Sequence, residues 1–214
     1  MNNRVHDTPL DSPRLPLRIA GRRSEHRGAG QALAEFALVV PLFILLLLAV
    51  IEFALVLHAV LVLNFATREA SLIAAEAGSA ADADCLILQA LDSSVDAPAD
   101  AAQIQQVRIY RADRAGAPIP GDVTTYTRGG TTSCTLSGGV TVTLPYAVAG
   151  GAGYPPAERC NILAGCGGTH SSLDQVGVEA TYRYHVHTPI ASFFTSAGFS
   201  LHVKGNVMRM EPVL

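Results

Sequence analysis

The apolar residues of this chain are concentrated near its N-terminal end. From Phe36 to Ile51, 16 consecutive residues carry no charge and almost all are apolar, and after Glu52 the run continues to Leu63. At about 1.5 Å per residue, the 28 residues form a helix about 42 Å long, which exceeds the roughly 30 Å hydrocarbon core of a bilayer. Because the run is apolar on all sides, it predicts a transmembrane helix and not the core helix of a soluble domain.

Two residues interrupt this run. Pro41 removes one helical hydrogen bond and should kink the helix, which is tolerated in membranes. Glu52, followed by Phe53, stands near the outer end of the run. We interpret Glu52 as an interfacial carboxylate, with a proton carrier as the alternative. A cleaved secretory signal is another alternative for the whole run, but its apolar stretch is shorter and a small-x-small site follows it promptly.

Downstream of the run, the pattern predicts a small α+β domain. Helix should continue to Gly78, a natural C-cap residue, and Asp82 should cap a short second helix over residues 83–95. Alternating apolar and polar residues predict strands around Val107 and Ile109, over 140–144, over 176–187 and over 199–207. Residues 112–138 and 149–172 are predicted to be loops. The fold class is therefore a long N-terminal transmembrane helix followed by a small extracytoplasmic domain with an antiparallel sheet.

The charge distribution predicts how the chain is oriented. Residues 1–30 carry six arginines and three acids, whereas the remainder carries nine basic and fifteen acidic residues. A basic N-terminal segment before an apolar run stays in the cytoplasm. Residues 79–214 should therefore lie outside the inner membrane. The predicted parts are a leader over 1–30, a transmembrane and stem helix over 31–78 and a head over 79–214. Nothing in the composition favours nucleic-acid binding, because no basic run interleaves with aromatic residues.

Four cysteines lie beyond the apolar run, in the part expected to be exported. They are Cys85, Cys134, Cys160 and Cys166. An even number of cysteines in an exported domain indicates disulfides, but three pairings are possible and the sequence does not choose among them. A zinc site is disfavoured, because five residues separate Cys160 from Cys166 and common zinc ligands are closer together.

The junction between the leader and the apolar run carries a recognisable motif. Gly30 and Gln31 end the basic leader, and Glu35 and Phe36 open the apolar helix. The arrangement resembles the processing site of type IV pilin-like proteins, in which a membrane prepilin peptidase cuts after the glycine. The resemblance implies cleavage between Gly30 and Gln31, and a role for Glu35 in aligning subunits by meeting a neighbour's free amino terminus.

The wider stretch 30–57 resembles the TadE-like family of Tad pilus assembly proteins. The matching features are Glu35-Phe36, Pro41, the leucine-rich run and Glu52-Phe53; a weaker resemblance covers 176–212. The resemblance implies a minor pilin or pseudopilin of a Tad-type pilus and secretion system related to type II and type IV machines. Its implied partners are membrane lipid, other Tad pilins or pseudopilins, the inner-membrane assembly platform and prepilin peptidase. The alternative is a permanently anchored single-pass domain with a binding or adhesive function.

No motif predicts catalysis, a cofactor or a small-molecule substrate. The chain has no Gly-x-Ser-x-Gly or His-Glu-x-x-His sequence, and its glycine pairs fit no phosphate-binding pattern. His185 and His187 should share one strand face, which is compatible with a metal ion, but no third ligand is evident. We therefore interpret them as part of a solvated sheet face and predict an assembly protein, not an enzyme.

Overall fold

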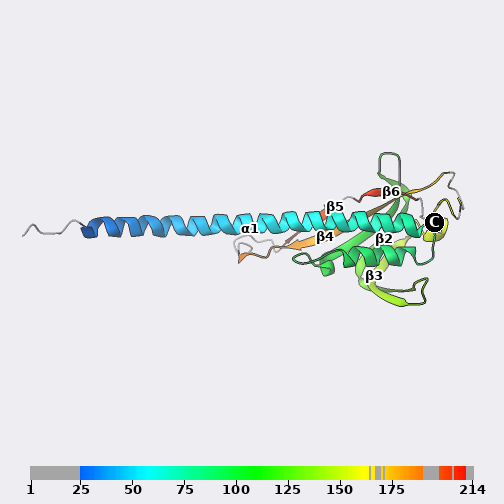
Figure 1. Cartoon of the computed structure of the whole chain (residues 1–214), viewed down its shortest axis with the longest axis horizontal. Coiled ribbons are helices and arrows are strands. Elements are labelled where there is room, and N and C mark those ends of the chain that lie inside the picture. Colours follow the sequence, from blue (N-terminus) through cyan, green and yellow to red (C-terminus); the bar gives the residue numbers. More distant parts are fainter. Residues whose placement is uncertain are drawn as a thin grey trace, which may run out of the picture. The chain divides into compact units, whose positions relative to one another are not determined.

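The computed structural model describes residues 25–163, 165–166, 170, 172–189, 198–203 and 205–210, with side chains from residue 30 onward. The leader up to residue 24 and the last four residues lie outside this part. The chain divides into two units, residues 1–44 and 45–214, which we treat separately. Helix α1 (Glu25–Ala77) begins in the first unit and ends in the second (Figure 1).

In the first unit, α1 already includes the predicted end of the leader. The helix begins at Glu25, so the Gly30–Gln31 bond lies inside helical backbone. Pro41 is also accommodated within the helix. Side chains from residue 30 to 44 are exposed, apart from the half-buried Val40.

In the second unit, α1 ends as the sequence predicts, whereas the cap of the next helix does not form. Gly78 follows α1 with φ of +56°, and its N–H donates to the Ala74 carbonyl over 3.2 Å. Helix α2 covers Ala83–Ser93, but Asp82 makes no side-chain cap. Its carboxylate instead accepts hydrogen bonds from the Ser137 N–H and hydroxyl, both at 2.9 Å. The expectation of a capping Asp82 was wrong because donors distant in sequence occupy its carboxylate.

The described residues of the second unit contain an antiparallel sheet of six strands, which confirms the α+β class. The strands run in the order β3-β2-β1-β4-β5, and β6 pairs with the beginning of β4. Their bounds are β1 Ile104–Ala112, β2 Pro118–Thr135, β3 Thr141–Ala152, β4 Gln175–His185, β5 Gly198–Val203 and β6 Val207–Arg209.

The prediction of a loop over 112–138 was wrong, because β2 occupies most of it. Strand β2 is rich in threonine, and its buried positions Thr124 and Tyr126 alternate with less buried neighbours. The pairing with β3 shifts register between Arg128 and Thr132, around a pair of glycines. Those glycines and the scarcity of large apolar residues conceal the strand in the sequence. In the region 149–172, β3 extends to Ala152, and the described residues beyond it include a short 3-10 helix, Pro156–Glu158.

The core lies between one face of the sheet and the two helices. On β4, the alternating residues Val176, Val178, Ala180, Tyr182 and Tyr184 are all buried, as the sequence predicts. They share one hydrophobic cluster with a buried stripe of α1 and with α2; the stripe consists of Ala59, Leu63, Ala66, Ala70 and Ala74. Because four of these five residues are alanines, the backbone of α1 can approach the sheet closely.

Candidate functional site

The predicted processing segment forms one accessible turn of α1. The Gln31 side-chain amide donates to the Glu35 carboxylate over 3.1 Å. Phe36 is 66% exposed, and a side chain placed at Gly30 would meet no atom within 4 Å. The side chains of this segment are therefore accessible.

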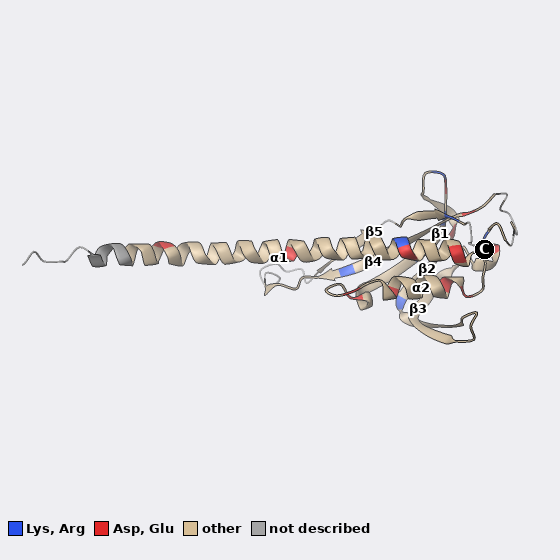
Figure 2. Cartoon of the chain, in the orientation of Figure 1, with Lys and Arg blue, Asp and Glu red and all other residues tan. Residues whose placement is uncertain are grey.

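Along the second unit, α1 exposes an apolar row on the side away from the core. This apolar row consists of Val50, Leu57, Leu61, Phe65 and Leu72, which are 58%, 49%, 50%, 66% and 43% exposed. At 100° per residue these positions lie within about 80° of one another and roughly opposite the buried alanines. Few charged residues interrupt α1 (Figure 2). The row is the face that a partner helix would cover.

Glu52 lies on the core side of α1 and is bound by the end of β4. Its carboxylate accepts hydrogen bonds from the Tyr184 hydroxyl at 2.6 Å, the Thr188 N–H at 2.9 Å and the His187 N–H at 3.2 Å. We call this arrangement the Glu52 clasp. Charge-assisted hydrogen bonds of this kind are stronger than neutral ones. The clasp binds the end of β4 to α1. The sequence did not indicate this role of Glu52.

Within the described residues, one helix is long and apolar enough to cross a membrane, Gly30–Ala77. None of its most apolar window is buried, unlike the core helix of a soluble protein. Residues 30–72 match the family model described as TadE-like protein.

Residues 30–72 are a TadE-like segment.

The match indicates a Tad pilus component with an N-terminal membrane helix. No curated protein and no solved structure matches the chain. The TadE-like segment contains the predicted processing segment from Gly30 to Phe36, the whole apolar row and Glu52. Its partners in the clasp come from the far end of the chain, more than 130 residues away in sequence.

The cysteines form two disulfides outside the TadE-like segment. Cys85 pairs with Cys134 and joins α2 to β2, with 6.4 Å between the Cα atoms. Cys160 pairs with Cys166 and closes a short loop, with 4.2 Å between the Cα atoms. The structure thus selects one of the three pairings that the sequence left open.

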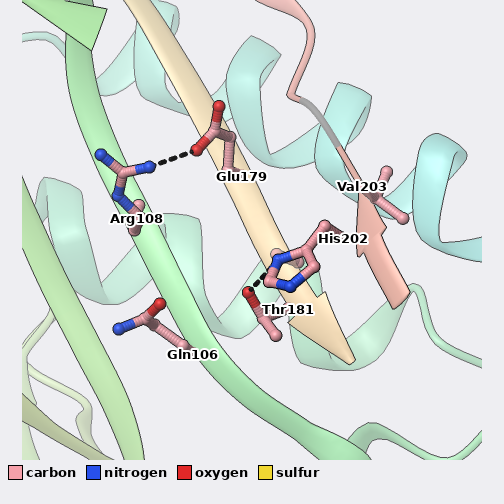
Figure 3. Close-up of a pocket in the computed structure, with 7 residues that line it drawn as sticks. Gln106, Arg108, Glu179, Thr181, His202 and Val203 are labelled. Atoms are coloured by element: carbon pink, nitrogen blue, oxygen red, sulfur yellow. Dashed lines mark hydrogen bonds and ion pairs between the residues drawn. The ribbon is translucent and has the colours of Figure 1, made fainter. Parts of the chain in front are cut away.

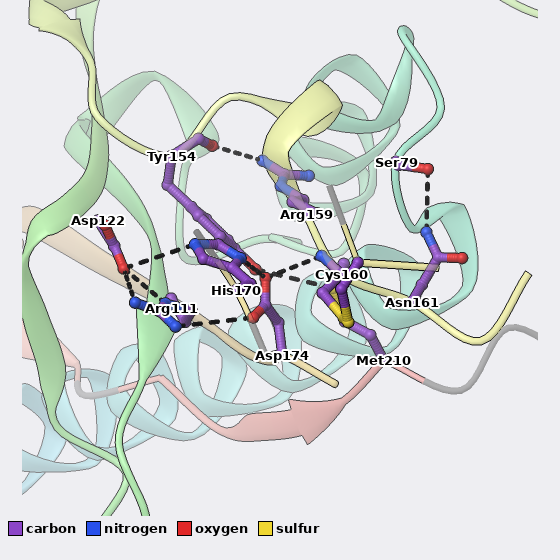
Figure 4. Close-up of polar contacts among 11 residues, drawn as sticks. Ser79, Arg111, Asp122, Tyr154, Arg159, Cys160, Asn161, His170, Asp174 and Met210 are labelled. Carbon is purple, nitrogen blue, oxygen red and sulfur yellow. Dashed lines mark hydrogen bonds and ion pairs between the residues drawn. A yellow bond between two sulfur atoms is a disulfide. The ribbon is translucent and has the colours of Figure 1, made fainter. Parts of the chain in front are cut away.

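A buried polar network holds the segment after β3 against the sheet (Figure 4). Asp174 accepts hydrogen bonds from the Tyr154 hydroxyl at 2.8 Å and the Cys160 N–H at 3.0 Å, and its carboxylate lies 3.0 Å from His170 Nδ1. Burial, and then the Asp174 carboxylate, raise the pKa of Tyr154. A second carboxylate, Asp84, pairs with the fully buried Arg159. The Arg159 Nη2 atom binds Asp84 and the Tyr154 carbonyl, whereas its buried Nε and Nη1 atoms have no hydrogen-bond partner among the described residues. Because the carboxylates of both groups bind partners inside the fold, we assign them a structural role.

The outer face of the sheet carries a shallow polar hollow of about 320 Å³ (Figure 3). Arg108 and Glu179 form an ion pair at 2.8 Å beside it, and the Thr181 hydroxyl lies 3.2 Å from His202 Nδ1. The described residues contain no group of three or more potential metal-binding side chains. The polar side chains of the hollow are therefore engaged with one another.

The expectation that His185 and His187 share a strand face was wrong. His185 lines a hollow beside Arg183, on the outer face of the sheet. The ring of His187 instead packs edge-on against Tyr184, whose side chain faces the helix, with 5.7 Å between the ring centroids. The reason is that β4 ends at His185, and the following residues turn so that their N–H groups reach Glu52.

Proposed function

We propose that this chain is a minor pilin-like or pseudopilin-like subunit of a Tad-type pilus machine, anchored in the inner membrane and assembled through α1. The observation that carries the proposal is the apolar row. It starts at Val50 in the membrane-spanning stretch and continues to Leu72, a distance of about 33 Å along the helix. The head covers the opposite side of α1 and leaves the row free.

The energetics favour a partner for this row. Fully burying a large aliphatic or aromatic side chain contributes about 1.5–3 kcal/mol, so each roughly half-exposed member of the row would gain about 1 kcal/mol on contact with another apolar helix. Outside the bilayer, Leu57, Leu61, Phe65 and Leu72 would otherwise face water. A partner with its own transmembrane and stem helix could cover the row on both sides of the membrane interface. Other Tad pilins and pseudopilins have the required apolar N-terminal helix.

Processing by prepilin peptidase would prepare the helix for assembly. Cleavage between Gly30 and Gln31 removes the six leader arginines and leaves a new amine on Gln31, so that Glu35 becomes the fifth residue of the mature chain. Glu35 then offsets part of its burial cost by pairing with the amine of a neighbouring subunit. Since the bond lies inside helical backbone, the peptidase must unwind this end of α1. Gly28 and Gly30 lower the cost, because each weakens a helix by about 1 kcal/mol relative to alanine.

The test combines processing with assembly in the native host. The mature protein should begin with Gln31, Gly30→Leu should block cleavage, and Glu35→Leu should insert normally but fail to enter the pilus. Leu61→Asn in the apolar row should reduce incorporation of a normally inserted, disulfide-bonded subunit. Its matched control is Val140→Asn, because Val140 is 60% exposed outside α1.

The outcomes separate this function from a permanently anchored binding or adhesive domain. An intact leader on the mature protein would remove the processing step, and a resident assembly factor would remain. Normal pili in the deletion strain and in both the Glu35→Leu and Leu61→Asn strains would refute the assembly role. The anchored binding domain would then be the better explanation.

A further inference from the structure

We propose that the head rests on the outer surface of the bilayer through an aromatic edge made of the exposed side chains of His187 and Phe199, which both pack against the buried ring of Tyr184. The proposed ligand is the interfacial layer of a phospholipid membrane, where headgroups meet acyl chains. The inference rests on the membrane anchoring in the proposed function. It adds a second lipid contact, made by the head and separate from the transmembrane helix.

The Glu52 clasp places this edge at the level of the membrane boundary. With Gly30, the end of the predicted leader, as the inner boundary, residues 30–51 provide 22 helical residues, or about 33 Å, close to the roughly 30 Å hydrocarbon core. With this boundary the span ends where the clasp begins. Since Tyr184 and the two backbone donors bind Glu52 directly, this end of β4 lies at the same depth.

The side chains at this end suit an interface. The Tyr184 ring lies 5.3 Å from that of Phe199 and 5.7 Å from that of His187, measured between centroids. Phe199 pairs with Tyr184 across β4 and β5 and is 47% exposed although it is large and apolar. An exposed phenylalanine ring is stabilised when it is buried at the boundary between headgroups and acyl chains. The clasp satisfies the Tyr184 hydroxyl and leaves the Phe199 ring available to lipid.

Charge at this end does not favour a particular headgroup. Arg183 is exposed near the end of β4, but Arg128 nearby is paired with Asp92 at 2.7 Å. The exposed carboxylate of Asp100 also belongs to this end, where the Asp100 N–H donates to the Tyr182 hydroxyl. We therefore assign the contact to the aromatic edge, which would bind a neutral phosphatidylcholine surface.

The opposite end of the head supplies an internal control. Leu163 is 58% exposed in the disulfide-closed loop, and its neighbour Asn161 packs against Gly78 and Ser79. From Glu52 to Gly78 the helix rises about 39 Å, so Leu163 is far from the membrane that α1 crosses. Phe199 and Leu163 are similarly exposed but differ in their predicted distance from lipid.

Because the chain has no tryptophan, single tryptophans report these positions without background. Phe199→Trp, Leu163→Trp and Val50→Trp would each be introduced into the full chain in phosphatidylcholine nanodiscs, with His187→Trp as a second reporter at the edge. Lipids brominated near the headgroup should quench the tryptophan fluorescence of Phe199→Trp. Its emission maximum should lie at a shorter wavelength than that of an indole exposed to water. Leu163→Trp should show neither change, and Val50→Trp should be quenched as part of the span.

Two results would overturn the proposal. If Phe199→Trp and His187→Trp are unquenched while Val50→Trp is quenched, the chain is anchored but its head is held away from the bilayer. If Val50→Trp is unquenched as well, the membrane span itself fails, and the proposed function fails with it. Equal quenching of Leu163→Trp would also contradict the proposal, because the contact would then not belong to one end of the head.

Discussion

Removing each disulfide separately should destabilise the head by different amounts, with the larger loss for the bridge that closes the longer loop. The bridge between Cys85 and Cys134 spans 49 residues, whereas that between Cys160 and Cys166 spans 6. In the chain-entropy model, closing loops of these lengths stabilises the folded state by about 4 and about 2 kcal/mol. Replacing both cysteines of a bridge by alanine should therefore cost about 2 kcal/mol more for the longer loop than for the shorter one.

The assay is urea unfolding of the full-length protein in detergent, followed by near-ultraviolet circular dichroism. The slope of free energy against urea must stay constant for the comparison to hold. Reducing the native protein should reproduce the sum of the two losses, and Ser133→Ala, next to Cys134, should leave stability unchanged because Ser133 is exposed. Equal losses, or a larger loss for the short loop, would refute an entropic origin of the difference.

Two further predictions concern buried polar contacts. Tyr184→Phe removes the side-chain donor of the clasp and should lower head stability by about 1.5–3 kcal/mol, the value of a hydrogen bond to a charged group. Thr188→Ala keeps the backbone donor and should cost less in the same urea assay; equal losses would contradict the assignment of the clasp. Asp84→Ala leaves Arg159 buried without its carboxylate and should cost about 3–5 kcal/mol. A loss below about 1 kcal/mol would mean that water reaches the guanidinium.

Local patterns made some elements predictable. The long apolar run identifies most of α1, and strict alternation over eleven residues identifies β4. Strand β2 was missed because its threonines and paired glycines resemble a loop, and its stability comes from pairing with β1 and β3. On β1, Tyr110 directly follows the buried Ile109 and is itself only 1% exposed, which breaks the alternation of the strand. Its ring covers Gly177 on the neighbouring strand, and no local pattern records that contact.

The candidate site was predictable only where its residues are adjacent in sequence. The turn from Gly30 to Glu35 is a local motif, so it could be recognised directly. The Glu52 clasp joins residues 132 to 136 positions apart, and nothing around Glu52 identifies Tyr184 or Thr188 as its partners. The sequence leaves the cysteine pairing undetermined for the same reason, because the bond between Cys85 and Cys134 depends on α2 lying beside β2.

The two sides of α1 in the second unit differ in what they contact, and mutations on the two sides should therefore have different phenotypes. The alanine stripe and Glu52 face the interior of a single subunit, whereas the exposed apolar row is the face that we propose for contacts between subunits. Substitutions one residue apart on the same helix would therefore give different phenotypes: loss of the folded protein in one case, and a stable but unincorporated protein in the other. Because the core of the head is formed within one chain, the subunit can fold completely before it binds a partner.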